Sequence, residues 1–366
     1  MKVLVIGGSQ FNGLALVYQL VSEGHEVTVL NRGRTEATLP GSVRHLTGDR
    51  TDGLHMRTLL ASEVFDCVFD MCAYHPPDVN MMTELLRDRT GHYVFISSIA
   101  IYAPSQIMPI TEDFPVDRSP EQNEYGLHKI LCEDHLLAEH EAHGFPVTTV
   151  VLPMVMGPRN ILPDREQRMF VRLLKRRPIL VPGDGTALSQ VGYVEDHAEA
   201  LCRIMGRPNT FGQRYNLTGS QFFSDEGYVD VLADVTGTQA EKVFIPADLM
   251  DQLWDGKIKA GRGRLTSHID VRSSDAQRAD SIAAMQRWQL ATLIQKAQPN
   301  LHRWNQSLVL SADKLARDVG WRPRHNFRQA VERTFEWFQQ EQLLDHDGFD
   351  FSFEDSILDL LRSRPA

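Results

Sequence analysis

Short apolar runs alternate with helical patterns over the first half of the chain. The runs are rich in β-branched residues and are bounded by polar or glycine-containing turns, which is typical of parallel strands buried on both faces. Strands separated by helices favour right-handed βαβ units, so we predict an α/β fold with a doubly wound parallel sheet. The predicted strands are residues 2–6, 25–30, 43–46, 65–71, 92–98 and 147–152.

The pattern changes after Pro153, where Pro and Gly become frequent and helical patterns dominate, among them residues 327–340. We therefore predict two domains. A dinucleotide-binding Rossmann domain covers residues 1–155 and about 188–218, which return to it. A smaller mixed α/β substrate domain with a C-terminal tail covers about 156–187 and 219–366. Open α/β sheets bind ligands at the carboxyl ends of their strands, so we expect the second domain over that edge.

The first predicted strand runs directly into a glycine-containing turn, residues 7–13. Gly7 would permit a tight reversal, and Gly13 would let the following helix pack close to the strand. The first amides of that helix would face a phosphate group. Gln10 stands where the usual fingerprint has a glycine that lets the backbone touch the pyrophosphate. Taken alone, the turn fits a dinucleotide site or an ordinary strand–helix connection.

Composition narrows the class of protein. The chain has 366 residues, of which 42% are apolar and 23% charged, as in ordinary globular proteins. Its net charge of −10 opposes general nucleic-acid binding, because neutralising phosphates needs surplus Lys and Arg. We expect no signal peptide before the first strand, and no apolar run approaches the roughly 18 residues of a membrane span.

Cysteine and histidine spacing argues against a metal site. The four cysteines form no CxxC pair, and no carboxylate or Cys spacing completes a site around His135, His140 and His143. The cysteines are therefore expected to be reduced core thiols. We predict a cytoplasmic protein without a membrane partner or a metal.

Tyr125 and Lys129 are four residues apart in a helical pattern, so they share one helix face. A Tyr-x-x-x-Lys motif is common by chance. Its significance comes from its position after the glycine turn and after a strand that ends in Ser98.

This order resembles the short-chain dehydrogenase/reductase superfamily, in particular its extended branch of nucleotide-sugar epimerases and dehydratases. Within that branch, residues 31–34 and 48–52 are most similar to an atypical group that includes chloroplast stem-loop-binding-like proteins, in which the second glycine is also replaced. The segments that carry the resemblance are residues 7–13, 95–102, 125–129, 157–158, 193–196, 215–217 and 311–323.

The resemblance implies a role for each of three side chains. Tyr125 would be the general acid/base, Lys129 would hold the nicotinamide ribose, and Ser98 would hold the reacting oxygen. A free phenol titrates at about pH 10, so its use near neutrality needs nearby positive charge that favours the phenolate. Lys129 and an oxidised nicotinamide would supply that charge.

The end of the second predicted strand bears on which dinucleotide is used. An acidic residue there usually binds the ribose 2′-hydroxyl of NAD. This chain has Asn31, followed by Arg32 and Arg34, which favours NADP, with NAD possible. The expected cofactor contacts are Gly7, Ser9, Gln10, Phe11, Asn12, Gly13, Asn31, Arg32, Arg34, Asp49, Arg50, Cys72, Ala73, Tyr74, Ser97, Tyr125, Lys129, Pro153 and Val155. The expected substrate contacts are His75, Ser98, Tyr102, Gln190, Tyr193 and Arg262.

We therefore expect an NAD(P)-dependent oxidoreductase, epimerase or dehydratase, with a nucleotide-activated sugar or a related polyol or carbonyl compound as substrate. The resemblance also implies a homodimer. The alternative is a non-catalytic dinucleotide-sensing or RNA-binding protein on the same fold. The acidic net charge and the intact set of Ser98, Tyr125 and Lys129 disfavour that alternative. Retention of the cofactor through the cycle would give epimerisation or dehydration, and its exchange would give net oxidation or reduction.

Overall fold

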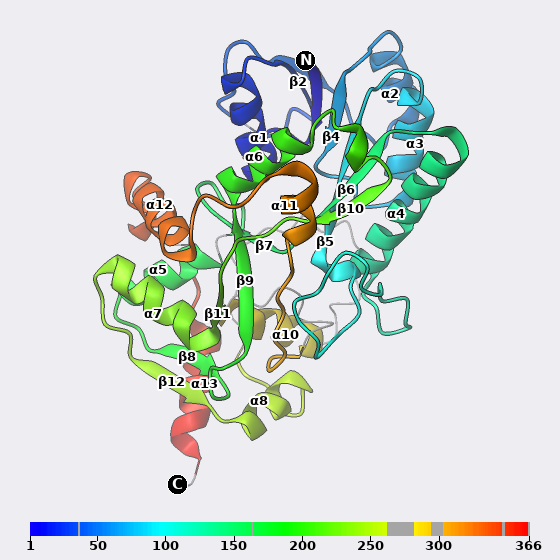
Figure 1. Cartoon of the computed structure of the whole chain (residues 1–366). Coiled ribbons are helices and arrows are strands. Elements are labelled where there is room, and N and C mark those ends of the chain that lie inside the picture. Colours follow the sequence, from blue (N-terminus) through cyan, green and yellow to red (C-terminus); the bar gives the residue numbers. More distant parts are fainter. Residues whose placement is uncertain (36, 163, 262–281, 294–302, 346–347, 365–366) are drawn as a thin grey trace.

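The structure is a computed structural model that describes the chain except residues 36, 163, 262–281, 294–302, 346–347 and 365–366. Seven strands form its central sheet in the order β10-β6-β5-β4-β1-β2-β3, and every neighbouring pair is parallel (Figure 1). The prediction of a doubly wound parallel sheet is thereby confirmed. The strands are β1 (Lys2–Ile6), β2 (Glu26–Asn31), β3 (Arg44–Thr47), β4 (Cys67–Asp70), β5 (Tyr93–Ser98), β6 (Val147–Leu152) and β10 (Gln213–Asn216).

Helices cover both faces of this sheet, because successive strand residues point to opposite sides. Val3 and Val5 of β1 pack in the core below α1 and α6, whereas Leu4 and Ile6 pack in the core below α2, α3 and α4. Figure 1 shows α1 and α6 together on one side of the sheet and the other three helices opposite them. These helices are α1 (Phe11–Ser22), α2 (Gly53–Leu59), α3 (Pro76–Leu86), α4 (Glu124–His143) and α6 (Val194–Ile204).

The strand order reverses between β1 and β4. Ile6, the last residue of β1, is in register with Leu30 of β2 on one side and with Asp70 of β4 on the other. The carboxyl ends of these strands therefore lie side by side. Loops leave this edge in opposite directions, which opens the crevice where doubly wound sheets bind ligands.

The rest of the described chain forms a second part, which lies below the central sheet in Figure 1. It contains a three-stranded sheet in the order β11-β9-β7 and a two-stranded sheet of β12 and β8. The predicted helix at residues 327–340 is confirmed as α12. The strands and helices of this part are β7 (Met154–Met156), α5 (Glu166–Leu174), β8 (Ile179–Pro182), β9 (Leu188–Tyr193), β11 (Phe222–Ser224), α7 (Asp225–Thr236), β12 (Lys242–Ile245), α8 (Ala247–Trp254), α10 (Ile282–Leu293), α12 (Phe327–Gln340) and α13 (Ser352–Ser363). The helix α11 (Asp313–Val319) instead packs against β10 at the edge of the central sheet.

Within the segment expected to return to the first domain, the structure places α6 against α1 and β10 at the edge of the central sheet, whereas β9 belongs to the three-stranded sheet. The buried cluster that contains Val3 and Val5 continues without a break into the second part. The proposed domain limits therefore stay a prediction.

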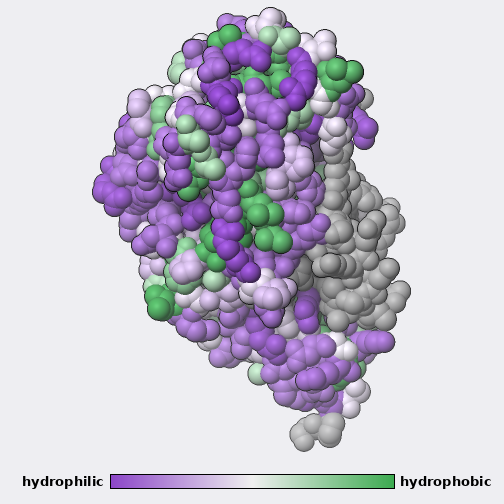
Figure 2. All heavy atoms as spheres, turned by 90° about the vertical axis from the view of Figure 1, so that its right-hand side faces the viewer, coloured by the Kyte–Doolittle hydropathy of each residue, from purple (hydrophilic) through white to green (hydrophobic). Residues whose placement is uncertain are grey.

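The side of the molecule that carries α3 and α4 faces the viewer in Figure 2. Hydrophilic residues predominate there, and hydrophobic residues form small separate groups. Over the residues that the structure describes, no helix is both long and apolar enough to cross a membrane.

Two histidines are buried in the core. His92 lies just before β5, where its Nε2 is 2.8 Å from Thr148 Oγ1 and its Nδ1 accepts a hydrogen bond from the Gly206 amide at 3.0 Å. His197 of α6 is 1% exposed, and neither of its ring nitrogens has a hydrogen-bond partner among the described residues. Burial lowers the pKa of each imidazole to about 3, because the charged form would lose its hydration.

We expect these histidines to make folding stability depend on pH below neutrality. The folded chain keeps both imidazoles neutral, whereas the unfolded chain binds a proton at each below about pH 6.5. The free energy of unfolding should thus fall, by up to about 1.4 kcal/mol per pH unit and histidine, as pH decreases from about 6.5 towards 3. Urea unfolding at several pH values should show a shallower dependence for His197→Leu. His143→Gln, at an exposed position, is the control, and a wild-type slope in His197→Leu would contradict the prediction.

Candidate active site

The turn after β1 depends on glycine at two positions. Gly7 has a φ of +87°, and a Cβ there would lie 2.9 Å from Cys72 Sγ. A Cβ on Gly13 would lie 2.2 Å from the carbonyl oxygen of Gly7. Because neither position tolerates a side chain, α1 begins directly against the end of β1, at the reversal in strand order.

This turn fits a dinucleotide pyrophosphate, despite the replacement at Gln10. Gln10 is exposed and its backbone is extended. Its side chain does not cap α1, so it accepts no hydrogen bond from the first backbone amides of the helix. Asn12 Oδ1 is buried and has no hydrogen-bond partner among the described residues. Ser9 is half-buried beside Gln10, and Phe11 is buried with a φ of +37°. The turn therefore presents unused backbone donors to an anion.

Close packing of α4 brings Tyr125 to the end of β5. Asn123 caps this helix by accepting a hydrogen bond from the Gly126 amide at 2.7 Å. A Cβ on Gly126 would lie only 2.6 Å from the carbonyl oxygen of Ala100, in the short helix η1 (Ile99–Ile101) that follows Ser98. Glycine at position 126 thus lets the first turn of α4 rest on the turn after Ser98.

Lys129 is held between two strand ends. Its side chain is buried, and its ammonium donates hydrogen bonds of 2.7 Å to the carbonyl oxygens of Ala73 and Ile96. The Nζ atom lies 5.8 Å from the centroid of the Tyr125 ring and 5.1 Å from that of Tyr74. An ammonium has three N–H donors, so these two carbonyls leave one for a ligand hydroxyl or the tyrosine.

The two serines at the end of β5 have different environments. Ser97 donates its hydroxyl proton to Glu133, which also pairs with Arg214 of β10. Ser98 accepts a hydrogen bond of 3.3 Å from the Ala100 amide, and its own hydroxyl proton has no acceptor among the described residues. The Ser97 side chain therefore joins β5 to Glu133 of α4, which in turn reaches β10, and Ser98 is the serine that can hold a reacting oxygen.

The residues after β4 connect the glycine turn to α4. Cys72 lies against Gly7, Ala73 accepts from Lys129, and the Tyr74 ring lies 6.3 Å from the Tyr125 ring. His75 follows them, and its Nδ1 is 2.9 Å from Nδ1 of His128 on α4. His128 was not among the predicted site residues, although its place between Tyr125 and Lys129 in the sequence could have indicated it.

The end of β2 forms the other end of the crevice. Asn31 Oδ1 accepts a hydrogen bond of 2.8 Å from the Gly33 amide and lies 3.0 Å from His45 Nε2. Asn31 Nδ2 is buried without a partner among the described residues, and Arg32 and Arg34 are exposed nearby in the chain. His45 was missed by the sequence analysis, because only the pairing of β2 with β3 places it beside Asn31.

Arg50 makes an internal ion pair. Its guanidinium binds the Asp70 carboxylate through two hydrogen bonds of 2.8 Å and also donates to the carbonyl oxygen of Asp78. Burial lowers the pKa of Arg50, but Asp70 raises it more strongly, and the pKa of Asp70 is lowered in turn. This guanidinium therefore ties the segment after β3 to the end of β4 and to α3, and its contact with a cofactor stays a prediction. Its neighbour Asp49 accepts from the Thr51 amide and hydroxyl.

Three of the predicted substrate residues also make internal contacts. The Tyr102 hydroxyl donates to Asn216 Oδ1 at 2.7 Å, and Tyr102 is fully buried. Gln190 donates to the carbonyl oxygen of Gly219 at 2.7 Å and accepts from the Leu310 amide. Tyr193 is buried with its ring beside His325. These three side chains therefore pack inside the protein, and their contact with a substrate stays a prediction.

The remaining predicted residues lie as follows. Pro153 connects β6 to β7, and Val155 is a buried residue of β7. Arg262 lies outside the described residues. In the described part of the chain, no three His, Cys, Asp or Glu side chains are grouped so that they could hold a metal ion.

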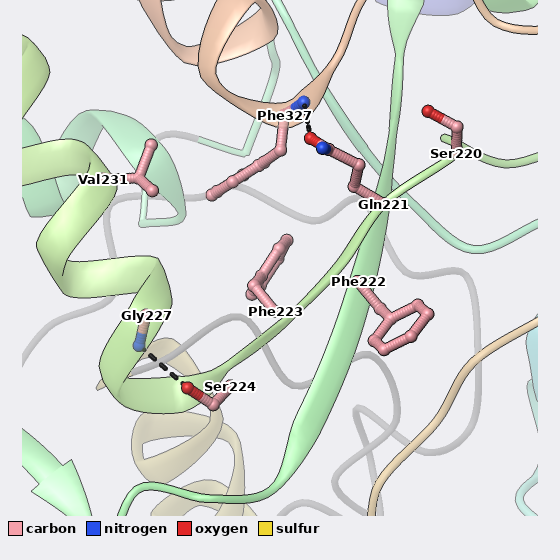
Figure 3. A pocket seen from close by; sticks show the side chains of 8 residues that line it. All are labelled: Ser220, Gln221, Phe222, Phe223, Ser224, Gly227, Val231 and Phe327. Carbon is pink, nitrogen blue, oxygen red and sulfur yellow. Dashed lines mark hydrogen bonds between the residues drawn. The ribbon is translucent and has the colours of Figure 1, made fainter.

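A pocket of about 420 Å³, lined by none of the predicted site residues, lies between β11, α7 and the start of α12 (Figure 3). The Gln221 side chain accepts from the Phe327 amide, Ser224 accepts from the Gly227 amide, and the Phe223 and Phe327 rings stack at 4.1 Å. No residue that lines it has an acidic, basic or phenolic side chain. It offers no acid–base group, so it is not the candidate active site.

Comparison with known proteins agrees with this geometry. The model of the NAD dependent epimerase/dehydratase family matches residues 3–218, which is more than half of the chain. The chain belongs to this family. It is accordingly an enzyme of the short-chain dehydrogenase/reductase type, and the family is NAD-dependent.

Named relatives of this epimerase/dehydratase chain have different activities. The chloroplast stem-loop binding protein of 41 kDa b from Arabidopsis thaliana is 32% identical over 249 residues, and the match covers 64% of this chain and 63% of that protein. The chain thus spans less than two thirds of this relative. A dTDP-glucose 4,6-dehydratase from Bacillus anthracis, solved with NAD, is 16% identical with a TM-score of 0.69, over 94% of this chain and 98% of that one. A UDP-glucose 4-epimerase from Thermotoga maritima, solved with UDP-glucose, is 17% identical with a TM-score of 0.69, over 93% and 100%. At these identities the two structures show the fold.

Proposed function

We propose that this enzyme transfers hydride between a nicotinamide dinucleotide and a carbon of a nucleotide-activated sugar, or of a related polyol or carbonyl compound. The position of Lys129 supports this most directly. Its ammonium is buried between β5 and the segment that follows β4, beside Tyr125. Dinucleotide or RNA binding alone does not need a buried lysine that faces a tyrosine.

Each active-site side chain then has a defined role. A bound nicotinamide supplies the hydride chemistry. Tyr125 exchanges a proton with the substrate oxygen, and the free hydroxyl proton of Ser98 holds that oxygen in place. Lys129 stabilises the phenolate by its charge and donates its third N–H to a ribose hydroxyl. Gly7, Ser9, Gln10, Phe11, Asn12, Gly13, Asn31, Arg32, Arg34, Asp49, Cys72, Ala73, Tyr74, the Ser97 backbone, Pro153 and Val155 are the cofactor contacts that we propose alongside Tyr125 and Lys129.

Mass spectrometry of small molecules that co-purify with the protein tests this proposal. We expect a dinucleotide, and recovery of a nucleotide sugar would name the substrate class. Candidate substrates can then be assayed through the absorbance of the reduced nicotinamide and by chromatography of the sugars. RNA affinity that falls steeply with salt, together with no turnover of any sugar or carbonyl compound, would instead favour the non-catalytic alternative.

We further propose NADP as the preferred dinucleotide, because Arg32 and Arg34 follow Asn31 where an acidic residue would repel a 2′-phosphate. The double variant Arg32→Gln/Arg34→Gln should weaken NADP binding about 10- to 100-fold, which corresponds to a combined loss of about 1.5–3 kcal/mol at this exposed site. NAD affinity should stay within about twofold, because NAD lacks that phosphate. Calorimetric titration measures both constants, with the exposed Arg57→Gln as control. Equal losses for the two dinucleotides would contradict the preference.

We also propose a homodimer formed through the face of α3 and α4. Leu127, Leu131 and Leu137 of α4 are 37%, 40% and 45% exposed. Exposed apolar surface of this kind is typical of a protein–protein interface. Leu131→Glu should convert the dimer to a monomer in light-scattering measurements, because it buries an unpaired charge at the interface. Leu54→Glu, at a 79% exposed position on α2, is the matched control and should leave the dimer intact. A monomeric wild-type protein would contradict this proposal.

A further inference from the structure

Two histidines meet at the edge of the active site. His75 lies between Tyr74 and the start of α3, and His128 lies on α4, three residues after Tyr125. Their Nδ1 atoms are 2.9 Å apart, and their rings meet edge to face with centroids 4.7 Å apart at 65°. This distance is that of an N–H···N hydrogen bond. The contact joins the segment that carries Ala73 and Tyr74 to the helix that carries Tyr125 and Lys129.

The hydrogen bond fixes how many protons the two rings hold. One Nδ1 must carry a proton and the other must be bare, so the neutral rings are opposite tautomers. One additional proton can bind to the unprotonated Nε2 of the ring that donates the hydrogen bond, without breaking that bond. A second would place N–H against N–H and separate the rings. The pair therefore gains and loses one proton as a unit.

Charged groups of both signs face the pair. From α4, the Glu124 carboxylate lies 3.9 Å from His128 Nε2, and Lys129 is the residue next to His128. From α3, the Asp78 carboxylate accepts from the His75 amide at 3.1 Å and is itself paired with Arg50. The surroundings of the pair thus include the carboxylates of Glu124 and Asp78 and the cations of Lys129 and Arg50.

Each histidine follows a tyrosine of the site: Tyr74 directly precedes His75, and Tyr125 lies three residues before His128. The two phenol rings lie 6.3 Å apart. The His128 side chain keeps 23% of its surface exposed. The pair is consequently in contact with solvent and joins the His75 segment to α4, the helix that carries Tyr125. An imidazole is the side chain that changes charge near neutral pH, which suits a group that exchanges protons with water.

We propose that His75 and His128 share one proton and serve as a proton store for Tyr125. This inference rests on the function proposed above. When the phenol O–H bond breaks and its proton goes to the substrate oxygen, the protonated pair returns one N–H proton to the phenolate oxygen. Solvent then restores the proton at Nε2. For oxidation of the substrate, the same proton moves in the opposite direction, from phenol to the pair and on to water.

The test uses the full-length protein labelled with ¹⁵N-histidine, with and without added NADP⁺, followed by nuclear magnetic resonance across the pH range. The expected result is opposite tautomers for His75 and His128. The variants His75→Gln and His128→Gln assign the signals, and each should shift the titration midpoint of the remaining histidine by about one pH unit. Tyr125→Phe should also shift the midpoint of the pair.

His135→Gln is the matched control. His135 also lies on α4 and also bonds towards α3, through Thr83 at 2.9 Å, but two turns beyond Lys129. It should leave the titration of the pair unchanged. Identical tautomers, or midpoints that do not respond to loss of the partner, would overturn the shared proton. A pair that titrates as a unit but ignores Tyr125→Phe would overturn the proton store.

These outcomes are distinct from failure of the proposed function. The histidine spectra need no substrate, whereas the proposed function fails only if the protein neither binds a dinucleotide nor transfers hydride. Where a substrate is found, His128→Gln should change the pH profile of kcat without a matching change in KM, and added imidazole should restore part of the rate. A purely structural contact would leave the shape of that profile unchanged.

Discussion

Tyr125→Phe should lower kcat by about 10²–10⁴-fold, the range typical of a general acid–base group. It should leave dinucleotide affinity close to the wild-type value, because Lys129 is anchored by backbone carbonyls and not by the tyrosine hydroxyl. Loss of the hydroxyl removes the proton donor and acceptor, but the phenyl ring keeps its place beside Tyr74. Steady-state kinetics on a substrate identified as above, together with calorimetric titration of NADP, measure the two effects separately.

Two further variants sharpen this test. Tyr18→Phe removes a phenol of α1 whose hydroxyl donates to the carbonyl oxygen of Thr38, and it should retain wild-type turnover. Lys129→Met should reduce both turnover and dinucleotide affinity, because it removes the buried ammonium that holds the ends of β4 and β5 together. Wild-type kcat in Tyr125→Phe would rule out the proposed chemistry.

The sequence predicted the central sheet well because its signals are local. Apolar β-branched runs such as that of β1 mark strands buried on both faces, and α12 has the period of an amphipathic helix. The second part was predicted only in outline. Its packing depends on contacts between distant residues, such as the ion pair of Arg168 with Glu354, which are 186 positions apart. No local pattern encodes such a contact.

The same distinction applies to the site. Residues that share one motif, such as Tyr125 and Lys129, could be predicted together because helix geometry relates them. His45 and His128 became visible only through strand register and the contact between α4 and the His75 segment. The ion pair of Arg50 could not be predicted, because a long side chain can point to either side of a strand end. Its partner Asp70 lies at the end of β4, separated from β3 by two strands of the sheet.

The C-terminal helix α13 is joined to α5 by a cluster of buried charges. Glu354 is 4% exposed, and both of its oxygens accept hydrogen bonds of 3.0 Å from Arg168. Arg172 pairs with the same carboxylate, and Arg168 also pairs with Asp164 at 3.2 Å. Burial opposes ionisation of Glu354, but Arg172 and Arg168 outweigh it and lower the pKa of this carboxyl. The pKa of Arg172 is itself lowered by burial.

Glu354→Ala should therefore reduce the free energy of unfolding by about 3–5 kcal/mol, because it leaves two buried guanidinium groups without their shared carboxylate. Urea unfolding at neutral pH measures this loss. Asp359→Ala, on the same helix at an exposed pair with Arg362, should change stability by no more than about 1 kcal/mol. Replacing Arg168, Arg172 and Glu354 with Met and Asp164 with Asn in one variant should recover most of the loss, since none of the charges of the cluster then remains to be desolvated.

The pH dependence of this cluster has a definite sign. Because the pKa of Glu354 is lower in the folded chain than its ordinary value of 4.5, its contribution to stability is complete above that value. The contribution is lost as pH falls through the folded-state pKa, where the carboxyl takes up a proton and the two guanidinium groups repel each other. The difference in unfolding free energy between wild type and Glu354→Gln should accordingly be constant from neutral pH to about pH 5 and shrink below it. A difference that is the same at pH 7 and pH 3, or a loss in Glu354→Ala no larger than in Asp359→Ala, would show that the charges of this cluster do not hold α13 on α5.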